Sequence, residues 1–219
     1  MRAANVNESN NKELVNRSLE SYLTQLAASD STPGGGTAAG LTGAQAAALL
    51  SMVCNLSQGE KFAAIRTTIV DLDGVCTDIR LKMLDLCADD IRVFNDVMAS
   101  YRLPRTNPDE KAARSSLIQQ SLVAAAEVPM TMMKEVSLLL PIADQLARIG
   151  NPNLISDVGV AVHLIDACMA SARLNVLINA RQLADTVIAT SLLDQTSQLM
   201  QGLAQLKPAI LAKVEAGVS

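Results

Sequence analysis

Apolar residues recur three or four positions apart along most of the chain, which is the spacing of one face of an α-helix. In the first such stretch Leu19, Tyr22 and Leu26 share a face. Clusters of glycine, proline and asparagine interrupt this spacing and end the helices. The pattern predicts helices over 13–28, 37–56, 61–101, 108–148 with interruptions at Pro129 and Pro141, 154–193, and a short closing segment after Pro208.

The composition favours the same fold class. The 219 residues include 32 Ala and 30 Leu but only 2 Phe, 2 Tyr and no Trp, whereas strands favour aromatic and β-branched side chains. We therefore expect an all-α bundle of five to six helices, two of them long, with no sheet. No stretch resembles a linker, so 13–219 is expected to form a single domain, preceded by a flexible tail over 1–12.

Charge and cysteine content exclude several kinds of partner. A net charge of −4 and few aromatic residues do not favour nucleic-acid binding. The uncharged window 31–59 is diluted by glycine, threonine and glutamine, which indicates a buried helix and no membrane span. The four cysteines are widely spaced without a nearby histidine. We expect reduced core thiols in a cytoplasmic protein, and no metal site.

A turn of three glycines is the first candidate for chemistry. Pro33, Gly34, Gly35 and Gly36 precede the helix predicted from 37, so backbone N–H groups without side chains lie at a helix N-terminus. Such a turn can bind an anion or a polarised carbonyl group, or it can simply let two helices touch. A nucleotide site is not favoured, because a helix precedes the turn where a dinucleotide fold has a strand.

Asp90 is the best candidate for a general acid or base. On a helix it lies in line with Met83, Leu86, Phe94 and Val97, so its carboxylate points into an apolar stripe, while Asp89 lies on a polar face. Desolvation raises the pKa of a carboxyl group and lets it carry a proton near neutral pH. A structural carboxylate, satisfied by a helix N-terminus or an arginine, is the equal alternative from the residues alone.

Three polar residues share another predicted helical stripe. Asp157, Asn175 and Asn179 lie on a face that is otherwise apolar. Asp157 also fits a structural role as an acid in the first helical turn, and the asparagines fit contacts between helices. No role is assigned to His163, the only histidine.

Several segments together resemble one family. They are 32–39 (Thr-Pro-Gly-Gly-Gly-Thr-Ala-Ala), 51–56 (Ser-Met-Val-Cys-Asn-Leu), 88–90 (Ala-Asp-Asp), 127–129 (Glu-Val-Pro), 150–153 (Gly-Asn-Pro-Asn), 156–161 (Ser-Asp-Val-Gly-Val-Ala) and 174–176 (Leu-Asn-Val). In this order, over about 13–205, they resemble the cyclodeaminase/cyclohydrolase family of folate enzymes, and bacterial methenyltetrahydrofolate cyclohydrolases in particular.

The resemblance implies an all-α homodimer that binds a tetrahydrofolate, with no metal and no cofactor beyond this carrier substrate. It implies Asp90 as the catalytic acid/base. Many members have a second acid two residues earlier, where this chain has Ala88. The substrate-binding residues that it implies are Pro33, Gly34, Gly35, Gly36, Asn55, Asp157, Asn175 and Asn179.

Two reactions fit the resemblance. The first is hydrolysis of 5,10-methenyltetrahydrofolate to 10-formyltetrahydrofolate in one-carbon metabolism, with a buried Asp as the acid/base, and it is the expected activity. The second is deamination of formiminotetrahydrofolate with release of ammonia. A helical dimerisation module without catalysis is the third alternative.

Overall fold

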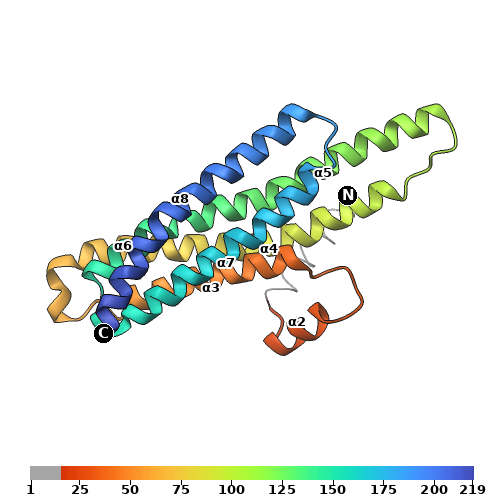
Figure 1. Ribbon diagram of the computed structural model, residues 1–219. Helices are drawn as coiled ribbons and strands as arrows, with labels where there is room; N and C mark the ends of the chain where they lie inside the picture. Colours follow the sequence, from red (N-terminus) through yellow and green to blue (C-terminus); the bar gives the residue numbers. More distant parts are fainter. Residues whose placement is uncertain (1–15) are drawn as a thin grey trace.

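The computed structural model describes residues 16–219, and the predicted tail over 1–12 lies outside them. The described chain consists of helices and connections, without a strand (Figure 1). This confirms the all-α class. The elements are α2 (Leu19–Leu26), α3 (Gly35–Asn55), the 3-10 helix η1 (Glu60–Ile65), α4 (Arg66–Tyr101), α5 (Pro108–Ser137), α6 (Leu139–Ile149), the 3-10 helix η2 (Pro152–Leu154), α7 (Ile155–Ala180) and α8 (Thr186–Val218).

α3 is the central helix, and small residues let its neighbours approach it closely. A Cβ added at Gly40 would lie 2.6 Å from Cys87 Sγ of α4, and one added at Gly43 would lie 3.0 Å from Cys168 Sγ of α7. Gly150, which precedes α7, lies against Val53 near the end of α3. α7 therefore runs antiparallel to α3.

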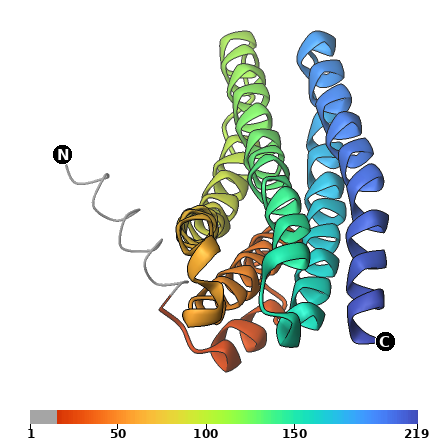
Figure 2. The ribbon, with the colours of Figure 1, turned by 90° about the vertical axis from the view of Figure 1, so that its left-hand side faces the viewer.

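The remaining long helices form two hairpins, α4–α5 and α7–α8, whose tips project side by side (Figures 1 and 2). Polar contacts hold the α7–α8 connection against the other hairpin, since Gln119 donates to the Gln182 carbonyl and accepts from Ala184 N–H. Lys207 and Lys213 of α8 pair with Asp166 of α7 and Asp144 of α6. These contacts hold α8 along the bundle.

The helix boundaries differ most from the sequence prediction at the start of α2 and between α7 and α8. α2 begins only at Leu19, where Ser18 caps it by accepting from Ser21 N–H at 3.1 Å. The helix expected over 154–193 ends at Ala180, and Asp185 starts α8 by accepting from Val187 and Ile188 N–H. The bundle therefore has four helices longer than 25 residues, α4, α5, α7 and α8, where two were expected.

Of the three prolines expected to interrupt helices, only Pro141 does, since α5 ends and α6 begins around Leu138, three residues before it. α8 continues through Pro208, because Ala204, whose carbonyl loses its partner, is exposed to water. α5 continues through the buried Pro129 and ends only at Ser137. Pro141 lies in the first turn of α6, where a backbone N–H has no partner within the helix.

The four cysteines are free and buried, as predicted. Two segments, Gly35–Asn55 and Pro152–Ala180, are long and apolar enough to cross a membrane by length and composition alone. Within the bundle, 56% and 44% of their apolar windows are buried. Core helices of this kind pass the same test, so it gives only weak evidence for a membrane span.

Candidate active site

The start of α3, which we call the near end of this helix, lies against the middle of α4. Gly34 is the N-cap of α3 and has no side chain with which to cap it. Asp90 of α4 lies at this terminus instead: its Oδ2 accepts from the Thr37 hydroxyl at 2.9 Å, and the backbone N–H of Thr37 also lowers the pKa of this carboxyl group. The group that lies at the glycine turn in this structure is thus the carboxylate of Asp90 itself.

The glycines of this turn have different surroundings. A Cβ at Gly36 would lie 2.0 Å from Asp90 Oδ1 and 2.5 Å from Asp90 Cγ, so no larger residue fits while the carboxylate stays in place. Gly35 is exposed, and a Cβ there would meet no atom within 4 Å. Pro33 is buried. Gly36 therefore serves the contact with Asp90, and Gly35 leaves the first turn of α3 open.

The environment of Asp90 favours a carboxyl group that can hold a proton. Burial raises its pKa above the usual value, and this effect exceeds the lowering by the hydroxyl and the backbone N–H of Thr37. Among the ion pairs of residues 16–219, none involves Asp90. The contact with Thr37 fits both the structural and the catalytic interpretation of Asp90, because it joins Asp90 to the start of α3 and also fixes the position of its carboxylate.

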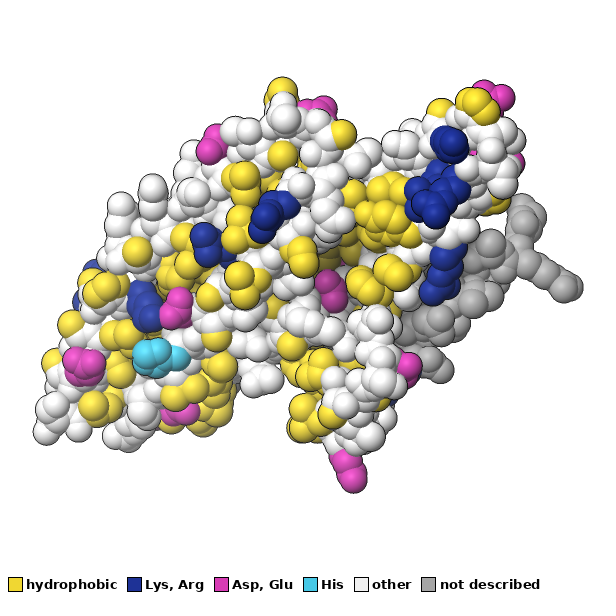
Figure 3. Space-filling model, turned by 45° about the vertical axis from the view of Figure 1, so that its right-hand side comes forward, with side chains coloured by type: hydrophobic (Ala, Val, Ile, Leu, Met, Phe, Trp, Pro, Cys, Tyr) yellow, Lys and Arg dark blue, Asp and Glu magenta, His cyan; other side chains and the backbone are white. Residues whose placement is uncertain are grey.

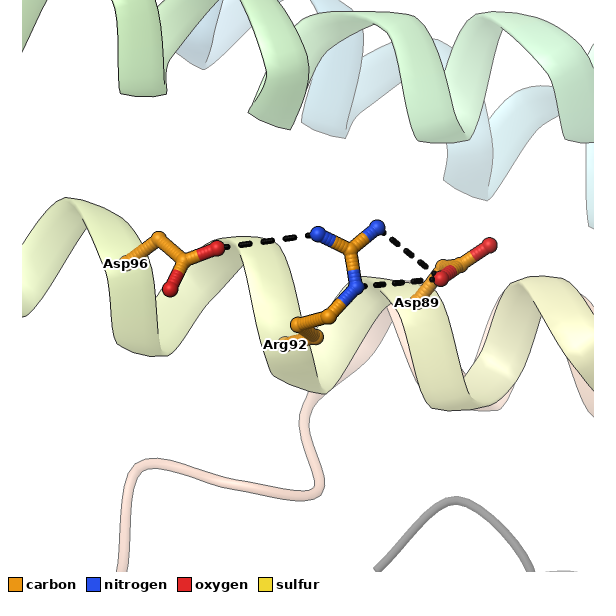
Figure 4. Close-up of polar contacts among 3 residues, drawn as sticks. All are labelled: Asp89, Arg92 and Asp96. Carbon is orange, nitrogen blue, oxygen red and sulfur yellow. Dashed lines mark hydrogen bonds and ion pairs between the residues drawn. The ribbon is translucent and has the colours of Figure 1, made fainter. Parts of the chain in front are cut away.

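Asp89 faces a different environment, as the sequence predicts. Its Oδ1 accepts from Arg92 at 2.9 Å, and Arg92 also approaches Asp96 at 3.6 Å on the surface of α4 (Figure 4). The neighbouring carboxylates therefore differ in partner. Asp89 belongs to a polar surface cluster, and Asp90 contacts the α3 terminus.

Beyond Asp90, part of the apolar surface of α4 is exposed. Met83 and Leu86 before Asp90 are almost fully buried, and Val97 after it is also buried. Phe94, one turn beyond Asp90, is 37% exposed, and so is Met98. This exposure follows from the length of α3, which begins at the level of Asp90 while α4 continues to Tyr101. Figure 3 shows apolar side chains gathered in a hollow between the two projecting tips of the molecule. Asp90 is thus next to an apolar surface that is open to a ligand.

Asn175 and Asn179 belong to the same end of the bundle. Gly43 of α3 lies against Cys168 of α7. Gly36 is seven residues before Gly43, and Asn175 is seven residues after Cys168. Because α-helices rise about 1.5 Å per residue, the two positions lie at the same level along the antiparallel pair.

Asn179 has a structural function that the sequence did not reveal. Pro129 has no N–H, so the carbonyl of Ala125 loses its partner within α5. Asn179 Nδ2 donates to this carbonyl at 3.0 Å and also to the Asn175 carbonyl at 3.0 Å. For Asn179, this is the contact between helices that was the alternative interpretation, whereas Asn175 donates to the Ser171 carbonyl of its own helix at 3.0 Å. The contact of Asn179 with Ala125 also explains why Pro129 does not interrupt α5.

Asn55 and Asp157 lie at the opposite end of α3, which we call its far end. Asn55 is exposed and donates to the Ser51 carbonyl at 3.0 Å and to Asp73 at 3.4 Å. It is 18 residues from Thr37 on one helix, or about 27 Å. Asp157 lies in the first turn of α7, in agreement with its structural interpretation. Within one chain, neither residue joins the near-end group.

Two residues of the near end were missed as site residues. Thr37 holds Asp90, and Cys87 donates to the Thr37 carbonyl at 3.4 Å. The position of Thr37 directly after Gly36 was the available signal. His163 is exposed on α7. Within the described part of the chain, no group of three or more His, Cys, Asp or Glu residues is placed to hold a metal ion.

A comparison with known protein families identifies the class of protein to which this fold and site belong. The family model "Formiminotransferase-cyclodeaminase" matches residues 18–198. The chain therefore belongs to the formiminotransferase-cyclodeaminase family, which confirms the resemblance drawn from the motifs.

Three proteins similar to this chain have more specific names than the family. A methenyltetrahydrofolate cyclohydrolase from Methylorubrum extorquens is 37% identical over 93% of this chain and 99% of that protein. A formimidoyltransferase-cyclodeaminase from Rattus norvegicus is 29% identical over 94% of this chain but only 38% of its own length. The crystal structure of a formiminotetrahydrofolate cyclodeaminase from Thermotoga maritima matches with a TM-score of 0.84 at 27% identity, over 94% of this chain and 99% of that one.

Proposed function

We propose that this protein is a methenyltetrahydrofolate cyclohydrolase, which hydrolyses 5,10-methenyltetrahydrofolate to 10-formyltetrahydrofolate. The observation that carries the proposal is the half-buried Asp90, held by Thr37 at the near end of α3 and bordered by an open apolar surface. The similarity to the M. extorquens cyclohydrolase over nearly the full length of both chains supports this substrate.

The chemistry requires one group that accepts and then returns a proton. Water attacks the cationic carbon that bridges N5 and N10, and Asp90 takes a proton from it as the C–O bond forms. The C–N5 bond then breaks while Asp90 returns this proton to N5. The remaining hydroxyl proton leaves to solvent as the formyl C=O forms, so the reaction releases one proton overall. A raised pKa suits Asp90 to both steps.

Deamination of formiminotetrahydrofolate is the second candidate, because the solved structure with a TM-score of 0.84 bears the name of a cyclodeaminase. In that reaction a folate nitrogen attacks the formimino carbon, and the same carboxylate protonates the departing ammonia. We favour hydrolysis because the identity to the M. extorquens cyclohydrolase is 37%, against 29% to the formimidoyltransferase-cyclodeaminase from Rattus norvegicus and 27% to the T. maritima cyclodeaminase.

We further propose a cytoplasmic homodimer that needs no metal and no cofactor beyond the folate carrier, and that binds neither nucleic acid nor membranes. The net charge of −4 and the four free buried thiols support this proposal. Sedimentation at several concentrations tests the dimer.

One paired assay distinguishes the candidate functions. Loss of the ultraviolet absorbance of 5,10-methenyltetrahydrofolate is followed in one sample, and ammonia release from formiminotetrahydrofolate in another. We expect turnover in the first. Turnover only in the second would establish the cyclodeaminase, and a protein that neither reacts with nor binds tetrahydrofolates would be the non-catalytic helical module.

A further inference from the structure

A cavity of about 90 Å³ lies where α2 covers α3 and α4. Its lining is mostly apolar with a few polar groups, as is common for ligand sites, and consists of Arg17, Leu19, Tyr22, Thr37, Leu41, Leu84 and Cys87. Thr37 connects the cavity to the proposed catalytic group, because the same hydroxyl donates to Asp90 at 2.9 Å. The cavity therefore borders the reaction centre on the side of α2.

Tyr22 is the one tyrosine in this lining, and its hydroxyl has no partner. The side chain is only 7% exposed, yet none of the hydrogen bonds of residues 16–219 involves Tyr22 Oη. Buried phenol groups normally find a partner. No fully buried polar side-chain atom in these residues is left unsatisfied, so the hydroxyl keeps some accessible surface, and the cavity is a space that the Tyr22 side chain lines. The Tyr22 hydroxyl can therefore donate a hydrogen bond to a group that enters the cavity.

The size of the cavity selects what can enter. The space of about 90 Å³ has room for several water-sized groups but not for a whole folate. The bridging carbon is bonded to both N5 and N10, so the edge of the substrate that carries this carbon and its added oxygen is the part that can project into the cavity. Burial, and then the proximity of Cys87 and Asp90, raises the pKa of Tyr22 above its usual value. The phenol therefore keeps its proton at neutral pH and acts as a donor.

We propose that this cavity receives the reacting one-carbon unit and that Tyr22 is a further catalytic residue, which donates a hydrogen bond to the oxygen that water adds to the bridging carbon. This inference rests on the proposed hydrolysis. The C–O bond forms as Asp90 takes one water proton, the C–N5 bond breaks as Asp90 returns it, and the second proton goes to solvent. Tyr22 keeps its own proton and stabilises the oxygen while the C=O bond develops.

Removing one hydroxyl tests the role of Tyr22. Tyr22→Phe keeps the ring that packs against the core and deletes a group without a partner, so we expect an unchanged melting temperature. We expect kcat for 5,10-methenyltetrahydrofolate to fall by about 10²-fold, the effect of losing one donor to a developing oxyanion. A purely structural tyrosine would change stability before kcat.

The other tyrosine provides the matched control. Tyr101 is 40% exposed, and its hydroxyl donates to Gln182 at 3.1 Å. Tyr101→Phe removes the same atom about 16 Å further along α4 from Asp90, so we expect kcat within about two-fold of the wild type. An equal loss in both variants would overturn the assignment.

A binding measurement gives a second readout that does not depend on turnover. Protein labelled with ¹³C-tyrosine has two ring environments because the chain has two tyrosines, and the Tyr22→Phe variant identifies the missing signal. We expect tetrahydrofolate to shift the Tyr22 signal. No shift of this signal, or full kcat in Tyr22→Phe beside an active wild type, would overturn the role of Tyr22 alone. A wild type that does not hydrolyse the methenyl substrate would overturn the proposed function together with this inference.

Discussion

The two ends of α3 carry the same kind of contact in different surroundings. At the near end Thr37 donates to Asp90, and at the far end Ser51 donates to Asp73. Both carboxylates come from α4. Only Asp90 lies at the N-terminus of α3, where backbone N–H groups favour an anion, and only there does a glycine let the carboxylate contact the helix backbone.

The difference shows what turns an ordinary hydroxyl–carboxylate pair into a candidate site. Asp73 is half-buried, and it accepts a further hydrogen bond from the exposed Asn55. Asp90 is desolvated on the side of the core and open to an apolar surface on the other side. Position relative to the helix terminus and to the core distinguishes the two pairs, and residue type does not.

Asp90→Asn should produce the largest effect. The amide keeps most of the shape of the side chain but cannot accept and return a proton, so we expect turnover to fall by about 10²- to 10⁴-fold while the fold remains. Steady-state rates with 5,10-methenyltetrahydrofolate and circular dichroism measure both properties.

Asp73→Asn is the matched control at the far end. It changes the same atoms in a carboxylate that also accepts a hydroxyl from α3. We expect nearly wild-type turnover. A larger loss for Asp73→Asn than for Asp90→Asn would place the chemistry at the far end and reverse the comparison.

Gly36→Ala should have the next largest effect. Its Cβ would lie 2.0 Å from Asp90 Oδ1, so the carboxylate must move. We expect a loss of about 1–3 kcal/mol in the free energy of unfolding from overpacking, and about 10²-fold lower kcat from the misplaced acid. Denaturant titration and steady-state kinetics measure the two effects.

Gly35→Ala adds the same methyl group one residue earlier, where it meets no atom within 4 Å. We expect no loss of stability in this control variant. Equal destabilisation by both alanines would mean that helix formation, and not the contact with Asp90, determines the cost.

The sequence predicted the features that periodicity encodes. The all-α class and the phase of Asp90 on its helix follow from the spacing of apolar residues. The separation of α7 from α8 was missed, although Asp185 is a good N-cap residue, because apolar spacing continues on both sides of it.

Contacts between helices were less predictable. Asp157, Asn175 and Asn179 share one helical face, but a long helix places the first of them at the far end and the others at the near end. The pairing of Asn179 with the Ala125 carbonyl depends on the register between α5 and α7, which no local pattern specifies. Tyr22 looks like an ordinary core residue until the cavity beside it is known.

A double-mutant cycle tests whether Asn179 supports the near end by satisfying α5. Asn179→Leu leaves the Ala125 carbonyl without a donor, and we expect it to cost about 1–3 kcal/mol. Pro129→Ala restores the missing N–H, so the cost of Asn179→Leu should be smaller in that background. Chemical denaturation of the four proteins gives the coupling free energy. Strict additivity would contradict the assignment, and Pro208→Ala, beside the exposed Ala204, is the control without such coupling.

Asn55→Ala should have the smallest effect, and it tests whether the far end of α3 takes part in the site. Asn55 is implied as a substrate-binding residue by its motif, yet it is exposed, bonded to Ser51 and Asp73, and about 27 Å from Thr37 along α3. We expect Asn55→Ala to leave both kcat and KM within about two-fold of the wild type, as for other surface substitutions. Because no single chain brings Asn55 close to Asp90, a clear rise in KM would require the far end of a second copy to complete the site. In that case KM would also depend on protein concentration across the range in which sedimentation detects dissociation of the dimer. A rise in KM that does not depend on protein concentration would contradict the assignment of the site to the near end.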